Sequence, residues 1–450
     1  MKNKIILFIT GCFTLLLASC LDSDDSSTVS APRDAQISSF SLSHDSIAGL
    51  SKVKFTIDQL NGQIFNKDSM PYGTKVGKVI CNMTYRSSAL TAAITQDAYP
   101  DSMFYWKEGD SIDFSKPVKI VVTALDRVMT KTYTAKVNIR QVNPDSMLWT
   151  LYASNPIPET IREQKVVVYP YNNTDAYFMY VKTNSSYKLY YSALSDAANW
   201  NELPLTGLTG DLLITQIALL DGYLYVPSES GMLYRSADGL NWMLANNAPS
   251  VKSVLGVLKE GREQIPLLAT IVEQNGTLHF AGMDANQEWT IGEQVYAKFP
   301  VVNFATTQYA NMYHSYLMAI GGRDKDNQLT NTVWATMNAT DWVLLTNENR
   351  DYFEKKEGAI LTRYDDKIFL AGGINAEGKA SKEIHVSKDY GVTWTLQDSL
   401  KAFPSGYKAR GFASVQVDTN NYMLIFGGKT SKNAESLNEI WRGRINRLSL

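Results

Sequence analysis

Cysteine and histidine are scarce in this chain, which has 3 cysteines and 4 histidines in 450 residues. Cys12 lies in an N-terminal segment with the pattern of a cleaved export signal, and Cys20 follows it at a position expected to be acylated, so Cys81 is the one free thiol expected in the mature chain. A lone cysteine excludes an intramolecular disulfide, a thiolate metal site and Cys-pair redox chemistry. Cys81 lies in the alternating run KVICNMTY and is predicted to be a buried small hydrophobe. We expect no metal ion and no cofactor.

An excess of positive charge is also missing. Lys and Arg number 43 against 45 Asp and Glu, a formal net charge of −2, and no basic cluster offsets this. Nucleic-acid binders usually carry a basic excess, so none is expected as a partner. GxSxG, HExxH and phosphate-binding glycine loops are absent as well. Catalysis is still open, because the paired carboxylates of a glycoside hydrolase have no sequence spacing of their own.

The N-terminus has the pattern of an export signal. Lys2 and Lys4 precede the apolar run Ile5 to Leu17, which is too short to span a bilayer comfortably. The run ends in LASC, which resembles the lipobox of bacterial lipoproteins. That resemblance implies a signal peptide at residues 1–19 and acylation of Cys20, whose acyl chains would hold the protein in outer-membrane lipid. The alternative is an ordinary signal peptide cleaved near Ala18.

An acidic tract, LDSDDSS, follows Cys20 directly. It has too few apolar residues to fold, so residues 20–35 are predicted to be a flexible tether. A tract of this kind resembles the surface-export signal of Bacteroidota-type lipoproteins. We therefore expect a lipid anchor in the outer membrane with display at the cell surface; an anchor facing the periplasm is the alternative.

Residues 36–145 have the pattern of a small β-sandwich. In KTYTAKVNIRQV the residues Tyr133, Ala135 and Val137 alternate with polar ones, the period of a half-buried strand. VKIVVTALD precedes it across a short turn, which predicts a hairpin, and further strands are predicted in ISSFSLSHD, KVKFTID and KVICNMTY. The segment resembles the Ig-like or cadherin-like modules of bacterial lipoproteins, which are usually spacers. Asn143-Pro144-Asp145 is the predicted boundary.

Residues 146–450 contain a repeat of about fifty residues. Tryptophans close five similar segments at positions 200, 242, 289, 342 and 394, and a sixth segment keeps its strand at Trp441. In the later copies an apolar strand ends in a pair of glycines, Gly321-Gly322, Gly372-Gly373 and Gly427-Gly428, before a polar loop and an aromatic strand. This pattern resembles the Kelch repeat and predicts an all-β fold: the sandwich followed by a six-bladed Kelch-like β-propeller. The resemblance gives the diglycines a structural role.

The sixth copy lacks the strand that follows the hairpin in the others. Leu148-Trp149-Thr150-Leu151 is similar to Thr393-Trp394-Thr395-Leu396, the last strand of the fifth copy. Residues 147–153 are therefore predicted to supply the missing strand and close the ring, which removes exposed sheet edges.

The hairpin SKDYGVTW resembles the Asp-box of sialidases and other propellers. An aspartate accepts bonds from turn amides, glycine permits positive φ, and tryptophan covers the turn. A shorter copy occurs in SADGLNW. The two copies assign a structural role to Ser236, Asp238, Gly239, Trp242, Ser387, Asp389, Gly391 and Trp394. The arginine-based motif of sialidases is absent, and copper-radical chemistry of the galactose-oxidase kind is excluded because residues 146–450 contain no cysteine.

A ligand would bind near the central channel of such a propeller. Tyr309, Tyr313, His314 and Tyr316 form an aromatic cluster, and Glu357 and Arg410 are predicted to occupy comparable positions in the next blades. These six residues are the candidate ligand contacts. Aromatic rings together with hydrogen-bonding groups suit a sugar. The alternative is that the aromatic residues only pack between blades.

The whole arrangement resembles exported Bacteroidota-type lipoproteins of unknown function, which have an Ig-like domain followed by a Kelch-like, galactose-oxidase-like propeller. The leading hypothesis is a surface-anchored, monomeric recognition protein that binds a glycan or a surface protein without catalysis. One alternative is a carbohydrate-active hydrolase or lyase with carboxylates on the central face. Another is a structural partner in an outer-membrane complex.

Overall fold

The computed structural model describes residues 31–86, 89–96, 99–144, 146–259, 265–346 and 350–447. They form two compact units, one ending at Asn143 and the other beginning at Pro144. The predicted signal peptide, Cys20 and most of the predicted tether lie outside the described residues.

The N-terminal unit forms two sheets over its described residues. One has the order β1 (Ile37–Ser43), β4 (Val79–Tyr85), β7 (Ser111–Ile112). The other has the order β2 (Phe55–Asp58), β3 (Gln63–Asn66), β9 (Thr130–Lys136), β8 (Val118–Ala124), β5 (Ala89–Gln96), β6 (Tyr99–Tyr105). A short 3₁₀ helix, η1 (Leu50–Lys52), follows β1. The five strands predicted in this unit are all present, and β8 and β9 form the predicted hairpin.

One apolar core lies between the two sheets. Alternate residues of β8 face it, as do Tyr133 and Ala135 of β9, so the period of two seen in the sequence marks the buried face. Cys81 is fully buried in the same core. Burial, with a smaller contribution from the carboxylate of Asp110, raises the pKa of its thiol to about 12. The prediction that Cys81 packs as a small hydrophobe is confirmed.

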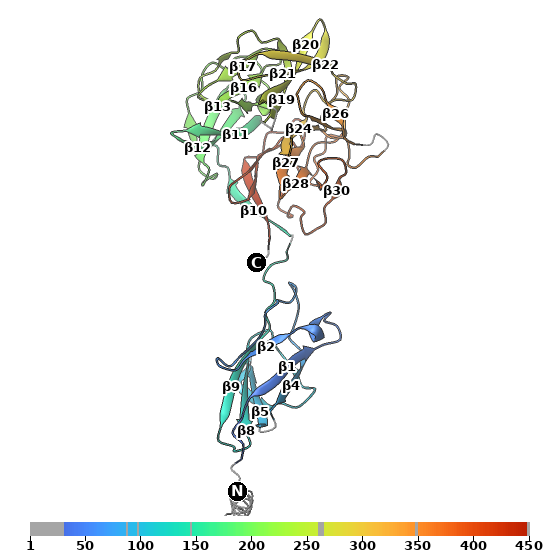
Figure 1. Ribbon diagram of the computed structural model, residues 1–450. Coiled ribbons are helices and arrows are strands. Elements are labelled where there is room, and N and C mark those ends of the chain that lie inside the picture. Colours follow the sequence, from blue (N-terminus) through green and yellow to red (C-terminus); the bar gives the residue numbers. More distant parts are fainter. Residues whose placement is uncertain are drawn as a thin grey trace, which may run out of the picture. The chain divides into compact units, whose positions relative to one another are not determined.

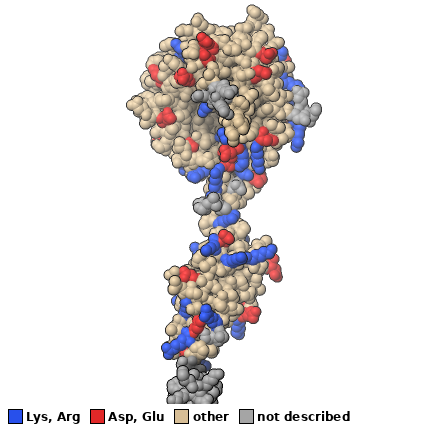
Figure 2. All heavy atoms as spheres, in the orientation of Figure 1, with Lys and Arg blue, Asp and Glu red and all other residues tan. Residues whose placement is uncertain are grey.

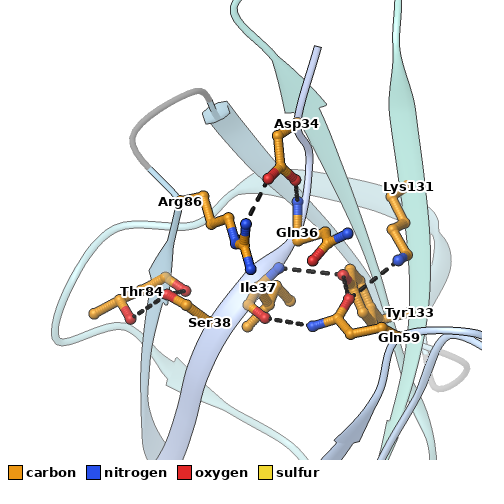
Figure 3. A network of polar contacts seen from close by, with 9 residues as sticks. All are labelled: Asp34, Gln36, Ile37, Ser38, Gln59, Thr84, Arg86, Lys131 and Tyr133. Atoms are coloured by element: carbon orange, nitrogen blue, oxygen red, sulfur yellow. Dashed lines mark hydrogen bonds and ion pairs between the residues drawn. The ribbon is translucent and has the colours of Figure 1, made fainter. Parts of the chain in front are cut away.

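A polar network joins the two sheets at one edge of this core (Figure 3). The Tyr133 hydroxyl of β9 donates to Gln59 Oε1 (2.6 Å) and accepts the backbone N–H of Ile37 in β1 (3.1 Å). Gln59 Nε2 donates in turn to Ile37 O (2.7 Å). The three residues come from β1, from the turn after β2 and from β9. The network therefore sets how β1 lies on the second sheet.

The described residues of the second unit form six four-stranded antiparallel sheets, here called blades 1 to 6 (Figure 1). Blade 1 is β11 (Glu163–Tyr171), β12 (Thr174–Lys182), β13 (Tyr187–Ala193), β14 (Asn201–Leu203), and blade 2, after the 3₁₀ helix η2 (Ile214–Gln216), is β15 (Ala218–Leu220), β16 (Tyr223–Pro227), β17 (Leu233–Ser236), β18 (Met243–Leu244). Blade 3 is β19 (Ser250–Leu258), β20 (Leu267–Gln274), β21 (Thr277–Met283), β22 (Trp289–Gln294), and blade 4 is β23 (Ala305–Ala310), β24 (Ser315–Ile320), β25 (Val333–Thr336), β26 (Val343–Leu344). Blade 5 is β27 (Ile360–Tyr364), β28 (Lys367–Ala371), β29 (Ile384–Ser387), β30 (Thr395–Leu396), and blade 6 is β31 (Ser414–Val417), β32 (Met423–Phe426), β33 (Glu439–Ile445), β10 (Met147–Ser154).

The ring closes through β10. This strand pairs antiparallel with β33, so the first strand of the unit completes the blade formed by the last three. Trp149 lies opposite Gly443, where a Cβ atom would come within 2.4 Å of the indole, and its ring packs on Phe403 at 4.5 Å. The predicted closing strand is therefore confirmed.

Six apolar clusters join the blades in pairs. The clusters connect blades 1 and 2, 2 and 3, 3 and 4, 4 and 5, 5 and 6, and 6 and 1. In the last of these, Tyr177 of blade 1 and Phe426 of blade 6 bring their rings to 5.8 Å. Each blade therefore buries both faces against neighbours, and the unit is a closed ring of sheets.

The glycine pairs lie where one blade contacts the segment that leads into the innermost strand of the next blade, here called its entry. All six of these glycines have positive φ. Gly322 N donates to Lys356 O (2.7 Å) and Gly373 N to Arg410 O (3.0 Å), so the bonds run from blade 4 to the entry of blade 5 and from blade 5 to that of blade 6. A Cβ on Gly322 would lie 2.6 Å from Val302 O, which leaves no room for a side chain.

The hairpin after β29 is held by side-chain bonds. Asp389 Oδ1 accepts from Ser387 Oγ (2.8 Å) and Thr393 N (2.9 Å), and its Oδ2 accepts from Thr393 Oγ1 (2.6 Å). Gly391 N donates to Ser387 Oγ (2.7 Å), and Trp394 Nε1 donates to Gly391 O (3.0 Å). Every polar group of the motif is bonded within the turn, as a structural role requires.

The shorter hairpin after β17 repeats the bonds to the aspartate, whereas Trp242 Nε1 has no partner among the described residues. Asp238 Oδ1 accepts from Ser236 Oγ (3.0 Å), Leu240 N (2.8 Å) and Asn241 N (2.8 Å). Gly239 has φ +73° and lies against the ring of Phe178 in blade 1. Trp242 packs edge-on against Tyr180 at 5.7 Å. This hairpin thus also contacts the preceding blade.

Replacing Asp389 with alanine is expected to destabilise the propeller by about 1–3 kcal/mol, because three donors lose their acceptor. Burial alone would raise the pKa of Asp389, but the bonds from Thr393 and Ser387 outweigh it and hold the pKa below its ordinary 3.8. A lowered carboxyl pKa stabilises the fold above pH 3.8, and this contribution is lost as the pH falls through the folded-state pKa. Chemical denaturation at pH 7 and pH 3 measures both effects.

Asp326→Ala is the matched control, since no described group bonds to that exposed carboxylate. If Asp389→Ala unfolded at the same denaturant concentration as this control, the hairpin would not be a structural element.

Candidate functional site

The innermost strands of the six blades surround a central channel. Its volume is about 550 Å³. β11, β15, β19, β23, β27 and β31 line it, together with η2 and the segments at the ends of these strands. Such a channel is the usual place for a ligand in a propeller.

The amide side chains in the channel hold the ring together. Gln416 Nε2 of blade 6 donates to Val166 O of blade 1 (2.9 Å), and Gln216 Oε1 of η2 accepts from Val254 N of blade 3 (2.8 Å). Gln308 of blade 4 donates to a backbone carbonyl of blade 3 in the same way. Each of these three amides is thus bonded to a neighbouring blade.

Besides the exposed Lys259, five lining side chains have a polar group that nothing in the described ranges bonds: Gln164 (its Nε2), Lys165, Thr215, Thr306 and Thr307. Gln164 is buried, and the other four are half-buried. Burial lowers the pKa of the Lys165 ammonium to about 8. Buried polar groups are normally paired, so unpaired ones along an open channel mark positions where a ligand's polar atoms can bind.

The charged side chains in the described part of the channel wall are all basic: Lys165, Lys259 and Arg363. Arg363 also pairs with exposed Asp366 at 3.1 Å. On the propeller face drawn in Figure 2, acidic and basic side chains are interspersed. The basic wall is therefore a local feature, since the chain as a whole is slightly acidic.

Phe412 lies at the entry of the channel with a strained backbone. Its φ is +58°, and the residues at the entries of the two preceding blades, Asn303 and Gly358, have the same left-handed conformation. Gly358 N donates to Asn303 O (2.8 Å) and Phe412 N to Gly358 O (2.6 Å). Positive φ suits glycine and asparagine, whereas for phenylalanine it costs about 1–3 kcal/mol. Its half-buried ring, with Lys429 Nζ at 5.8 Å, is thus a candidate ligand contact.

The predicted aromatic cluster packs chiefly against the protein. Tyr309 and Tyr316 stack at 4.9 Å, and Tyr390 from blade 5 stacks on the Tyr309 ring at 5.3 Å. Tyr309 is buried between blades 4 and 5. Tyr313 and His314 are exposed in the turn between β23 and β24.

Glu357 and Arg410 do not occupy positions comparable to this cluster, and that prediction is wrong. Backbone pairing makes Glu357 equivalent to Val302 and Gly411, at the entry of the inner strand, whereas the aromatic residues lie at its exit. A strand rises about 3.3 Å per residue, so the two ends of β23 are about 17–20 Å apart. In the sequence, the charged and the aromatic residues both flank an inner strand, but in the structure they lie at opposite ends of it.

Both charged candidates, Glu357 and Arg410, form ion pairs within the protein. Glu357, 1% exposed, accepts two bonds from Arg323 (both 2.8 Å) and one from Asn303 Nδ2 (2.7 Å). Burial would raise the pKa of Glu357, but these partners outweigh it and lower that pKa. Arg410 is fully buried, bonded to Glu439 and to Gly427 O (2.8 Å). Neither side chain is free to bind a ligand.

The sequence did not predict Lys165 as a channel residue, because it begins the run KVVVYP, which is typical of a buried strand. The available signal was a lysine directly before the apolar run of a strand that begins Glu163-Gln164. Within the described ranges no group of His, Cys, Asp and Glu has the geometry of a metal site. Nor does any helix there have the length and apolar character needed to cross a bilayer.

Comparison with known proteins places the chain in a family. Residues 143–450 match the DUF6242 beta propeller domain, and residues 26–137 match the N-terminal domain of unknown function of the same family. No curated protein matches the sequence. Among solved structures, the one titled "Structure of YjhT" aligns with 64% of this chain and 96% of its own at 12% identity and a TM-score of 0.45. Since the propeller match alone spans well over half of the sequence, this protein belongs to the DUF6242 family.

Proposed function

We propose that this protein is a surface-anchored lipoprotein whose propeller binds a glycan, or another polar cell-surface component, in its central channel without catalysis. The observation that carries the proposal is the channel wall, where an ammonium, three hydroxyl groups and the amide nitrogen of Gln164 remain unpaired among the described residues. A site formed on six interlocked strands is pre-organised, which lowers the entropic cost of binding. Acylated Cys20 and the acidic tract behind it would supply the anchor and tether.

The same wall argues against the alternative of a glycoside hydrolase. That chemistry needs two carboxyl groups, about 5–5.5 or 6.5–9.5 Å apart, on either side of the bond that is cleaved. No Asp or Glu occurs in the described channel wall. Glu357, at the entry of blade 5, is held ionised by Arg323 and cannot serve as a proton donor at neutral pH.

A glycan array probed with the chain from residue 21 onward tests the proposal. We expect saturable binding that weakens about tenfold or more when the channel hydroxyls are removed in Thr306→Val/Thr307→Val, because each lost bond is worth about 1 kcal/mol. Thr395→Val, on the exposed outer strand β30, is the control and should bind as the wild type does. Binding that ignores the channel variants, or release of shorter saccharides from any ligand, would contradict the proposal.

The anchor has its own test. Incorporation of labelled palmitate should require Cys20, so Cys20→Ser should abolish labelling. In intact cells the wild-type protein should be cut by added protease. A labelled protein that is resistant in intact cells but cleaved after lysis would place the anchor on the periplasmic side.

A further inference from the structure

Lys165 occupies an unusual electrostatic position in the channel. It lies in β11, where its register partner on β12 is Tyr180. The Tyr180 hydroxyl already donates to Gly239 O (2.8 Å) and is buried, so it does not offer Lys165 a negative charge. The neighbouring inner segments contribute Gln216 and Gln416, both committed to backbone groups of other blades. Among the described residues, the ammonium therefore has no counter-ion.

A half-buried charge without a partner is costly. Removing an ammonium from water is repaid only by an opposite charge or by several hydrogen bonds. Here burial shifts the ammonium toward its neutral form, with no carboxylate to oppose the shift. If the lysine served packing alone, an uncharged side chain would do so at lower cost.

The other charged side chains in the described wall reinforce the same sign. Lys259 follows β19 directly and Arg363 lies in β27, and both are exposed. A channel lined by charges of one sign within low-dielectric walls concentrates ions of the opposite sign. Thr215, Thr306 and Thr307 supply unpaired hydroxyls in the same space. This combination of cations with neutral hydrogen-bonding groups suits a ligand that has both negative charge and many hydroxyls.

We propose that the channel selects acidic saccharides, meaning sugars that carry carboxylate or sulfate groups, and that Lys165 binds the anionic group. The exposed Lys259 and Arg363 attract the charge, and the threonine hydroxyls bind the ring oxygens. This inference rests on the proposed glycan-binding function and names the class of glycan.

Calorimetric titration of the chain from residue 21 onward tests the inference with three probes. These are a galacturonate oligosaccharide, a sulfated chondroitin oligosaccharide and a neutral galactose oligosaccharide of the same length. We expect one or both acidic probes to bind about 10- to 100-fold more tightly than the neutral probe, the usual value of a charge-assisted bond. Lys165→Met should remove that advantage, so that the variant binds acidic and neutral probes with similar affinity, and Lys165→Arg should retain part of it. Lys379→Met should have no effect, because Lys379 is an exposed lysine between β28 and β29 that is not part of the channel wall.

The pH dependence provides a second readout. Lys165 is charged below its pKa, so affinity for the acidic probe should be constant up to about pH 8 and then fall about tenfold per pH unit. Lys165→Met should lose this dependence. The variant should also melt no lower than the wild type, since it removes an unpaired buried charge.

The outcomes separate the two proposals. Equal affinity for neutral and acidic probes, together with unaltered binding by Lys165→Met, would overturn the selectivity for acidic sugars while leaving glycan binding intact. If no saccharide bound in the titrations or on the array, both glycan binding and the selectivity for acidic sugars would be overturned. Inorganic sulfate binding as tightly as the sulfated probe, with the same dependence on Lys165, would overturn the saccharide as the ligand and leave an ion site.

Discussion

Glu439→Ala is expected to lower the stability of the propeller by about 3–5 kcal/mol, the usual cost of removing one partner of a buried ion pair. Arg410 has no solvent exposure, and Glu439 Oε1 accepts both its guanidinium and Trp441 Nε1 (3.0 Å). Without the carboxylate, the guanidinium keeps its bonds to Gly427 O and Lys408 O but has no counter-charge. Urea unfolding followed by tryptophan fluorescence measures the loss.

Glu377→Ala is the matched control for this variant. Its glutamate pairs with Lys379 at 2.8 Å, but both side chains are more than half exposed, at 67% and 76%. An exposed pair of this kind is worth about 0–1 kcal/mol, so the control should unfold almost as the wild type does. Comparable losses for the two variants would show that burial does not determine the strength of the Arg410 pair. A replacement of Arg410 and Glu439 together by Met and Leu should recover part of the stability, because no buried charge is then left unpaired.

Removing β10 is expected to open the ring. A chain that begins at residue 155 lacks the strand opposite β33, so the backbone groups of β33 become an exposed edge and the pocket for Trp149 against Phe403 is vacated. Exposed edges of this type pair with other chains, so we expect aggregation or soluble oligomers and a loss of the cooperative unfolding transition. Size-exclusion chromatography and thermal melting measure both.

A chain that begins at residue 144 is the control, because it keeps β10 and the whole second unit. It should elute as a monomer and melt in one transition. A monomeric, cooperatively folded chain from residue 155 would contradict the role of β10. Addition of a synthetic peptide with the sequence of residues 144–155 should restore the truncated chain in part, since the strand is supplied by pairing and not by a covalent loop.

Local patterns in the sequence determined where the strands of this protein lie. The period of two in β8 and β9 marked the buried face, because successive side chains of a strand point to opposite sides. The recurring tryptophans and glycine pairs marked the repeat, and the similarity of Leu148-Trp149-Thr150-Leu151 to the last strand of the fifth copy located the closing strand. These features were predictable because each depends on neighbours in the chain or on comparison of one repeat with another.

Only the tertiary structure decided which residues face the channel. Glu357 and Tyr309 both belong to segments around inner strands, yet one lies at a strand entry in an ion pair and the other at a strand exit in a ring stack. Lys165 sits in a run that looks like any buried strand, and its lack of a counter-ion depends on what five other blades place around it. Burial and charge pairing across a ring are set by residues far apart in sequence, so periodicity along one strand cannot reveal them.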